Sequence, residues 1–176
     1  YESGNGVARN LTRAVQWYRK AAEQREPRGM FCLGLCYKRG DGVEQDYTEA
    51  VKWFQRAAEG GYIRALCSLG VAYEFGEGVE ENLERAVDFY RQAAEKGDPA
   101  GQCNLAYMYE SGRGISQDYG EAARLYRLSA EAGYPRAMSN YGYCCEAGQG
   151  VEKDASAAAG WYRRAAEAGD AGGACN

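Results

Sequence analysis

Residues 63–98 read IRALCSLGVAYEFGEGVEENLERAVDFYRQAAEKGD, and this pattern returns every 36 residues along the chain without a gap. Further copies begin at residues 27, 99 and 135, and shortened copies lie at both ends of the sequence. A fixed period of this length is typical of repeat proteins, in which each unit buries its apolar face against its neighbours. The sequence therefore predicts a stack of similar units.

The repeat boundaries define the expected domain organisation. We expect one solenoid over residues 1–176, with a partial repeat at 1–26, full repeats at 27–62, 63–98, 99–134 and 135–170, and a partial repeat at 171–176. YESGNGV at 1–7 matches YESGRGI at 109–115, so we expect the chain to start inside a repeat. The helix around Val15, Trp17 and Tyr18 would then lack part of its cover, and we expect this end to contact another copy or to be partly disordered.

Each copy reads as two helices. The first has small and apolar residues at helical spacing, as in Ala65, Leu66, Leu69, Gly70 and Tyr73. The second has the same spacing and ends in an alanine pair followed by glutamate, except in one copy, where Ser129 precedes Ala130. Small residues let the helices approach closely, and we expect aromatic residues to fill the spaces between pairs. These are Trp17, Trp53, Phe89 and Trp161 at one position, and Tyr18, Phe54, Tyr90, Tyr126 and Tyr162 beside it. The fold class predicted is an all-α, right-handed α-α superhelical solenoid.

Helix starts are marked by proline and by capping residues. Pro27, Pro99 and Pro135 fall where a first helical turn tolerates proline, and Asp98 is the expected N-cap before Pro99. The expected N-caps of the second helices are Asn10, Asp46, Asn82, Asp118 and Asp154. In two copies a glutamate, Glu49 or Glu121, follows at the capping-box spacing.

Helix ends are marked by glycine. Each first helix is expected to stop at the first glycine of a Gly-x-Gly pair, where glycine can adopt the left-handed conformation. The second helices are expected to stop at Gly61, Gly97, Gly133 and Gly169. Arg25 stands at the corresponding place in the opening copy, so we expect that turn to be distorted.

Composition excludes several classes of function. The net charge is -4 with pI near 5.1, and acidic and basic residues are interspersed, which argues against nucleic-acid binding. No apolar run approaches the roughly 20 residues that a membrane helix needs. The chain has no histidine, so Cys/His and Ser/His nucleophile pairs are excluded. The glycine pairs follow helices, whereas a dinucleotide site needs a preceding strand. We therefore expect no catalytic residue and no cofactor.

Seven cysteines lie on first helices and none on second helices, at positions 32, 36, 67, 103, 144, 145 and 175. Without histidine or a Cys-x-x-Cys pair, zinc binding is not expected, and we predict no metal site. Cys67, Cys103 and Cys175 share one repeat position, but neighbouring helices pack roughly 10 Å apart, beyond the 7 Å or so that a disulfide spans. Free thiols are expected, which favours a reducing compartment such as the cytoplasm.

A glutamate recurs near the end of every second helix, where its charge opposes the helix dipole. It is present in all five copies, at positions 23, 59, 95, 131 and 167. We expect a hydrogen bond from each carboxylate to the next repeat to offset this cost.

The repeated motif is specific. The pattern A-x-x-x-L-G-x-x-Y-x-x-G-x-G-V, then D, then A-x-x-W-[FY]-x-x-A-A-E-x-G resembles the Sel1-like repeats, a branch of the tetratricopeptide-like helical repeats. The resemblance covers essentially the whole chain. It implies an α-solenoid that acts as a scaffold or adaptor for other proteins, without catalysis. One branch of that family staples each helix pair with a disulfide, which requires a cysteine on both helices and cannot form here.

The resemblance also implies that the first helices line a concave groove. Residues flanking the L-G pair would point into it and contact a partner protein or an extended peptide. Carried over to this chain, the partner-binding residues are Arg28, Phe31, Leu35, Arg64, Val71, Phe75, Asn104, Tyr107, Arg136, Asn140 and Tyr143, with Arg39, Ser111 and Glu146 on the same face. These positions vary between copies while the packing positions do not. Two alternatives stay open: a rigid spacer, and a non-catalytic arm of a larger protein.

Overall fold

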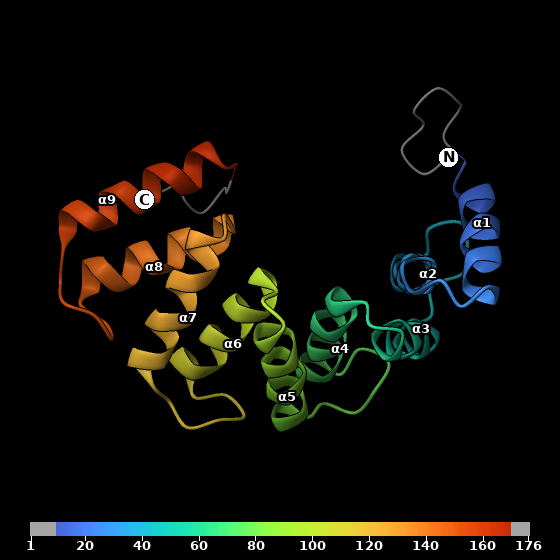
Figure 1. Ribbon diagram of the computed structural model, residues 1–176. Coiled ribbons are helices and arrows are strands. Elements are labelled where there is room, and N and C mark those ends of the chain that lie inside the picture. Colours follow the sequence, from blue (N-terminus) through green and yellow to red (C-terminus); the bar gives the residue numbers. More distant parts are fainter. Residues whose placement is uncertain (1–9, 170–176) are drawn as a thin grey trace. The chain divides into compact units, whose positions relative to one another are not determined.

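The computed structural model describes residues 10–169, and within that range the chain is helical without a β-strand (Figure 1). The chain divides into two compact units, residues 1–82 and 83–176. The first unit contains α1 (Leu11–Glu23), α2 (Pro27–Arg39), α3 (Tyr47–Glu59) and α4 (Ile63–Phe75). The second contains α5 (Leu83–Glu95), α6 (Pro99–Ser111), α7 (Tyr119–Glu131), α8 (Pro135–Ala147) and α9 (Ala155–Glu167). Residues 1–7, Cys175 and the expected partial repeat at 171–176 lie outside the described range.

Within each unit the helices pack mainly in chain order. In the first unit α1 packs on α2, α2 on α3 and α3 on α4, and in the second the same order runs from α5 to α9. The first helices of the repeats are α2, α4, α6 and α8, and the second helices are α1, α3, α5, α7 and α9. This alternation of helix pairs confirms the all-α solenoid that the repeat predicts.

The expected N-caps are in place on most second helices. Asn10, Asp46, Asp118 and Asp154 each accept a hydrogen bond from a backbone N–H in the first turn of the helix that follows. On the first helices the three prolines occupy the first turn, and Asp98 accepts from the Gly101 N–H at 2.8 Å. The chemistry of the cap residues therefore sets where these helices begin.

The capping-box interpretation is only half right. Asp46 accepts from the Glu49 N–H at 2.9 Å, but its own N–H donates to the Tyr37 carbonyl of α2 at 2.9 Å, and Glu49 instead pairs with Lys52. Asp118 repeats the arrangement, with its N–H donating to the Tyr109 carbonyl at 3.0 Å. The bond that a capping box would make within one helix is replaced by a bond that ties each cap to the preceding helix.

Left-handed residues end the helices. Gly40, Gly76, Gly112 and Gly148 close the first helices with φ between 67° and 75°, as expected. The second helices end two residues before their glycines. Arg25 adopts φ 58°, and its N–H bonds to the Ala22 carbonyl at 3.0 Å, as the Gly61 N–H bonds to that of Ala58 at 2.9 Å. The expected distortion of the Arg25 turn is therefore wrong, since the backbone there follows the same path.

The second glycine of each Gly-x-Gly pair lies against the start of an earlier second helix. A Cβ at Gly42 would lie 2.6 Å from the carbonyl of Leu11 at the start of α1. In the second unit a Cβ at Gly114 would lie 2.6 Å from the carbonyl of Leu83 in α5. Real Cβ atoms do not approach backbone this closely, so the loop of one repeat can rest on its neighbour only through glycine.

The core of each unit combines alanines with larger apolar residues such as Leu33, Leu69 and Met108, and three of the second helices each add a buried aromatic residue. Phe54 in the first unit and Tyr90 and Tyr126 in the second are no more than 2% exposed. The expected filling role is wrong for Trp17, which is 57% exposed and has the Lys20 ammonium 4.8 Å from its ring centroid. Self-association through this end stays a prediction.

Candidate functional site

The expected binding residues of the first unit lie on α2 and α4. Arg28 and Arg64 are exposed, and Phe75 is 61% exposed. Phe31 is half-buried because its ring packs against Phe54 and Tyr62, with centroid distances of 5.6 and 4.8 Å. Leu35 and Val71 are also half-buried. This unit thus combines exposed arginines with apolar side chains. Of these, Phe31 is engaged in packing within the unit.

In the second unit the structure brings three of the expected residues together between α6 and α8. Arg136 Nε donates to the Sγ atom of Cys103 at 3.4 Å, and Arg136 Nη2 donates to Asn104 Oδ1. Asn140 Nδ2 donates to the same sulfur at 3.9 Å. We call Asn104, Arg136 and Asn140 the donor cluster. Cys103 lies under it, fully buried.

Tyr107 and Tyr143 extend this face by one helical turn. Each follows an asparagine of the donor cluster by three residues, and side chains at this spacing are neighbours on a helix surface. They are 44% and 46% exposed. The residue before each tyrosine is small and faces the second helix. A Cβ at Gly142, for example, would lie 2.9 Å from the Tyr162 ring. The small residue therefore packs against the second helix, and the tyrosine that follows it on the first helix is exposed to solvent.

The thiols of the second unit are held in the protonated form. Burial raises the pKa of Cys103, although Arg136 and Asn140 act in the opposite direction. Burial likewise raises the pKa of Cys144 to about 12. None of the six cysteines within residues 10–169 forms a disulfide, and no metal-binding cluster occurs in that range. At neutral pH the sulfur of Cys103 is a hydrogen-bond acceptor and not a thiolate nucleophile.

Sequence reasoning missed a tyrosine–glutamate hydrogen bond that joins the two helices of a repeat in the second unit. Tyr126 of α7 donates to Glu110 of α6 at 2.7 Å, and Tyr162 donates to Glu146 at 2.7 Å. The signal was present in the repeat alignment. Where the second helix carries tyrosine at this position the first carries glutamate, and where it carries Phe54 the first helix carries Lys38 instead.

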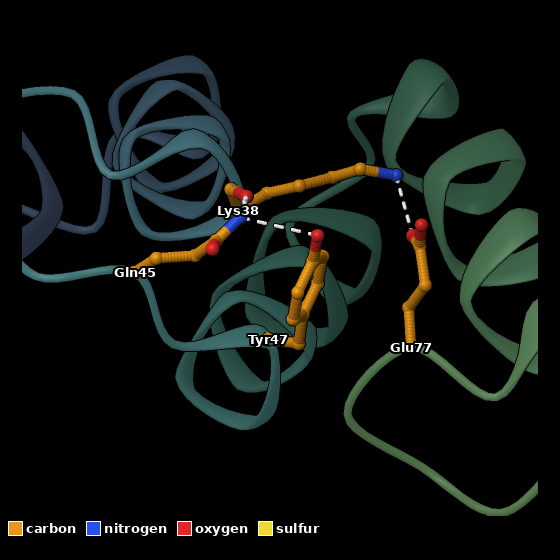
Figure 2. Close-up of polar contacts among 4 residues, drawn as sticks. All are labelled: Lys38, Gln45, Tyr47 and Glu77. Carbon is orange, nitrogen blue, oxygen red and sulfur yellow. Dashed lines mark hydrogen bonds and ion pairs between the residues drawn. The ribbon is translucent and has the colours of Figure 1, made fainter.

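Lys38 is used differently from the glutamates. Its ammonium lies 2.6 Å from the carboxylate of Glu77, in the loop after α4 (Figure 2). Below it, Gln45 Nε2 donates to the Lys38 carbonyl at 2.9 Å and to the Tyr47 hydroxyl at 3.1 Å. Phe54 has no hydroxyl group that could donate to a residue at position 38. Lys38 forms an ion pair with Glu77 instead, and this pair links two successive repeats of the first unit.

The hypothesis for the recurrent glutamates is wrong. All five side chains are exposed, and Glu131 pairs with Arg127 of its own helix at 2.8 Å. Glu23 and Glu59 line a cavity of about 600 Å³ together with residues that include Ala22, Met30 and Trp53. Solvation at the surface is sufficient for a carboxylate at a helix end, so no bond to the next repeat is required.

The model of the Sel1 repeat matches residues 1–25, 27–62, 63–98, 99–134 and 135–170. The chain belongs to the Sel1 repeat family. Proteins of this family act as scaffolds for protein interactions and are typically non-catalytic. Among curated proteins, none matches the chain. None of the helices described in residues 10–169 has the length and apolar character that a membrane span requires.

Solved structures of Sel1 repeat proteins are similar to this chain. One from Oxalobacter formigenes is 38% identical over 94% of this chain and 66% of that chain, with a TM-score of 0.89. The protective antigen c5321 of uropathogenic Escherichia coli, which displays an SLR fold, is 39% identical over 98% of this chain and 37% of that chain, with a TM-score of 0.87. The Sel1 chain described here therefore spans under two thirds of the length of either.

A more distant structure shares the fold alone. The immunity protein Pa5087 from Pseudomonas aeruginosa is 22% identical, with a TM-score of 0.67 over 94% of this Sel1 chain and 61% of that chain. Its similarity supports the solenoid architecture and carries no residue-level conclusion.

Proposed function

We propose that this Sel1 repeat chain is a scaffold whose first-helix face binds a partner protein or an extended peptide. The observation that carries the proposal is the exposure of Phe75, Tyr107 and Tyr143 on first helices whose other faces are packed. Large side chains with both apolar and hydrogen-bonding character are the residues that dominate binding energy at protein interfaces. The resemblance to other Sel1-like repeats predicts that this face is concave.

The polar residues on the same face suit an extended peptide. Asn104 and Asn140 can each donate to and accept from a peptide backbone, and arginine can bind a carboxylate through two parallel hydrogen bonds. No catalytic role is assigned to any of these residues, because a scaffold needs only complementary shape and charge.

The test compares two triple variants as baits for capture of protein partners. Arg64→Ala, Tyr107→Ala and Asn140→Ala together alter the first-helix face. Gln55→Ala, Gln92→Ala and Arg163→Ala alter exposed positions of the second helices. We expect the first variant to lose partners that the parent and the second variant retain, with all three equally helical by circular dichroism. If the first variant retains every partner, the face is not the binding surface and the spacer role is favoured.

A further inference from the structure

We infer that the donor cluster of α6 and α8 binds acidic side chains, so that the partner is recognised through a segment rich in glutamate or aspartate. The inference rests on the proposed function and names the chemistry of the ligand. Three observations support it. Arg136 has no carboxylate partner, the glutamates on the same helices are hydrogen-bonded to second helices, and the donor cluster retains N–H groups that can donate to a ligand.

Arg136 is partnered by neutral groups only. Its guanidinium contacts the Cys103 thiol and the Asn104 amide, and it lies 5.8 Å from the centroid of the Tyr134 ring. No carboxylate of the described residues forms an ion pair with it. Two nitrogens of this guanidinium, Nε and Nη2, donate hydrogen bonds to these groups. A guanidinium has five N–H groups in a planar arrangement that matches the two oxygens of a carboxylate, so donors remain for a ligand. The cation is therefore positioned by its neighbours but not neutralised by them.

The acids on the same two helices are engaged elsewhere. Glu110 of α6 accepts from Tyr126, and Glu146 of α8 accepts from Tyr162, both at 2.7 Å. Each carboxylate is thereby held toward a second helix. Neither competes with an incoming ligand for Arg136.

The cluster offers donors to a ligand. The Asn104 carbonyl oxygen already accepts from Arg136, which leaves its amide N–H groups available. The first turn of α8 also has no side-chain cap, because Tyr134 makes no capping bond, whereas α6 is capped by Asp98. Its unpaired N–H groups add positive potential at the same end of the helix. The Tyr107 and Tyr143 hydroxyls, one turn away, are further donors.

Charge on the first helices of the other unit has the same sign. Helix α2 contains three basic residues and no acid, and α4 contains Arg64 and the buried Glu74. Lys38 pairs with Glu77, but Arg28, Arg39 and Arg64 form no ion pair within residues 10–169. Over α2, α4, α6 and α8 there are five basic and three acidic residues, in a chain whose net charge is -4. The four first helices together therefore carry a small net positive charge, which favours an acidic ligand over a basic one.

The test uses two fluorescent decapeptide pools and the full 176-residue chain. One pool has glutamate at alternate positions and uncharged residues elsewhere, and the other replaces every glutamate by glutamine. Binding is followed by fluorescence anisotropy. We expect the glutamate pool to bind at least about tenfold more tightly, and to weaken as ionic strength rises from about 0.05 M to about 0.5 M.

Three variants locate the effect. Arg136→Gln should weaken binding of the glutamate pool by about tenfold, and Arg136→Lys should recover part of it because the charge returns without the fork. Arg163→Gln on α9 removes the same charge from an exposed second-helix site and should change binding by less than about twofold. Melting curves followed by circular dichroism verify that each variant is folded.

The outcomes separate this inference from the function on which it rests. If both pools bind equally and only the triple variant of the first-helix face abolishes binding, the face binds peptides but acidic recognition is refuted. If Arg136→Gln and Arg163→Gln weaken binding equally, or if the glutamate pool does not bind, the donor cluster is not the site. If the glutamate pool does not bind the parent chain and the triple variant also captures every partner, both proposals are refuted.

Discussion

Arg25 adopts a backbone conformation that the other repeats give to glycine. The left-handed region costs roughly 1 kcal/mol for a residue with a Cβ, and Arg25 is the only residue other than glycine with positive φ within residues 10–169. We expect Arg25→Gly to raise the free energy of unfolding by about 0.5 to 1 kcal/mol. Urea denaturation followed by circular dichroism measures the change.

Gly61→Ala is the reciprocal control for this substitution. Gly61 has φ 89° and nothing within 4 Å of the place that a Cβ would occupy, so only backbone strain is added. We expect this variant to lose about 1 kcal/mol. A destabilised Arg25→Gly variant would instead mean that the arginine side chain, which lies on the cavity beside Trp53, contributes more than the strain costs.

Tyr126 couples the stability of the second unit to alkaline pH. Burial, then the hydrogen bond to Glu110, raises the pKa of this phenol above its ordinary value near 10. In the unfolded chain the phenol ionises near pH 10, so the unfolded state binds fewer protons there and stability falls as pH rises. The contribution of Tyr126 is fully present below pH 10 and is lost as the pH climbs toward the raised pKa.

Tyr126→Phe isolates this contribution. We expect it to cost about 1.5 to 3 kcal/mol at neutral pH, because the Glu110 carboxylate loses its donor. The decline in stability above pH 10 should also become shallower than in the parent. Urea denaturation at several pH values measures both effects. Tyr107→Phe, at an exposed tyrosine, is the control and should change stability by no more than about 0.5 kcal/mol. An unchanged alkaline slope in Tyr126→Phe would contradict the assignment.

At the scale of the element, the sequence predicted helices well because their limits are set by local chemistry. Asp46 and Asp118 begin helices through their own side chains, and glycines end them through backbone conformation. The sequence could not predict which group accepts the hydrogen bond from the backbone N–H of each capping residue. That bond runs from Asp46 to the Tyr37 carbonyl of another helix, so it depends on how a pair packs.

The candidate site shows the same division between local and packed information. The resemblance to Sel1-like repeats led us to expect Tyr107 and Tyr143 on an open face, and both side chains are exposed. The resemblance did not show that Phe31 packs against Tyr62, nor that Arg136 reaches across from α8 to Asn104 on α6. Arg136 and Asn104 lie 32 residues apart and meet only when two repeats stack. Helical periodicity within one element carries no information about that distance.

The Glu110–Tyr126 bond illustrates what a repeat protein reveals without relatives. Glutamate and tyrosine occur together at these two positions in four of the five copies, and the copy at 27–62 replaces both of them, with Lys38 and Phe54. Five copies within one chain serve as a small alignment, and a joint exception in such an alignment indicates contact. Comparing exceptions between copies would have found this pair from sequence.

At the scale of the whole molecule, packing in chain order makes the repeats modular. Stability in such chains is the sum of repeat and neighbour terms, so a complete unit can be removed without abolishing the fold. Deleting residues 99–134 joins Asp98 to Pro135, which restores the Asp-Pro junction found at Asp98 and Pro99. The N-cap, the first-turn proline and the repeat register are all preserved.

We expect the deletion variant to remain helical and to unfold cooperatively at a lower temperature. Its dependence of unfolding free energy on urea should fall by roughly a fifth, because that slope scales with the surface exposed and 36 of 176 residues are removed. A variant with the same deletion shifted to residues 105–140 is the control. This deletion joins Asn104 to Tyr141, so that Tyr141 and Gly142 stand where Leu105 and Ala106 stood in the first helix. Because the 36-residue step is preserved, this variant should also fold. A deletion of residues 99–126, which breaks the step, should not. Equal unfolding of all three variants would show that the chain folds as one indivisible core, against the modular order of its helices.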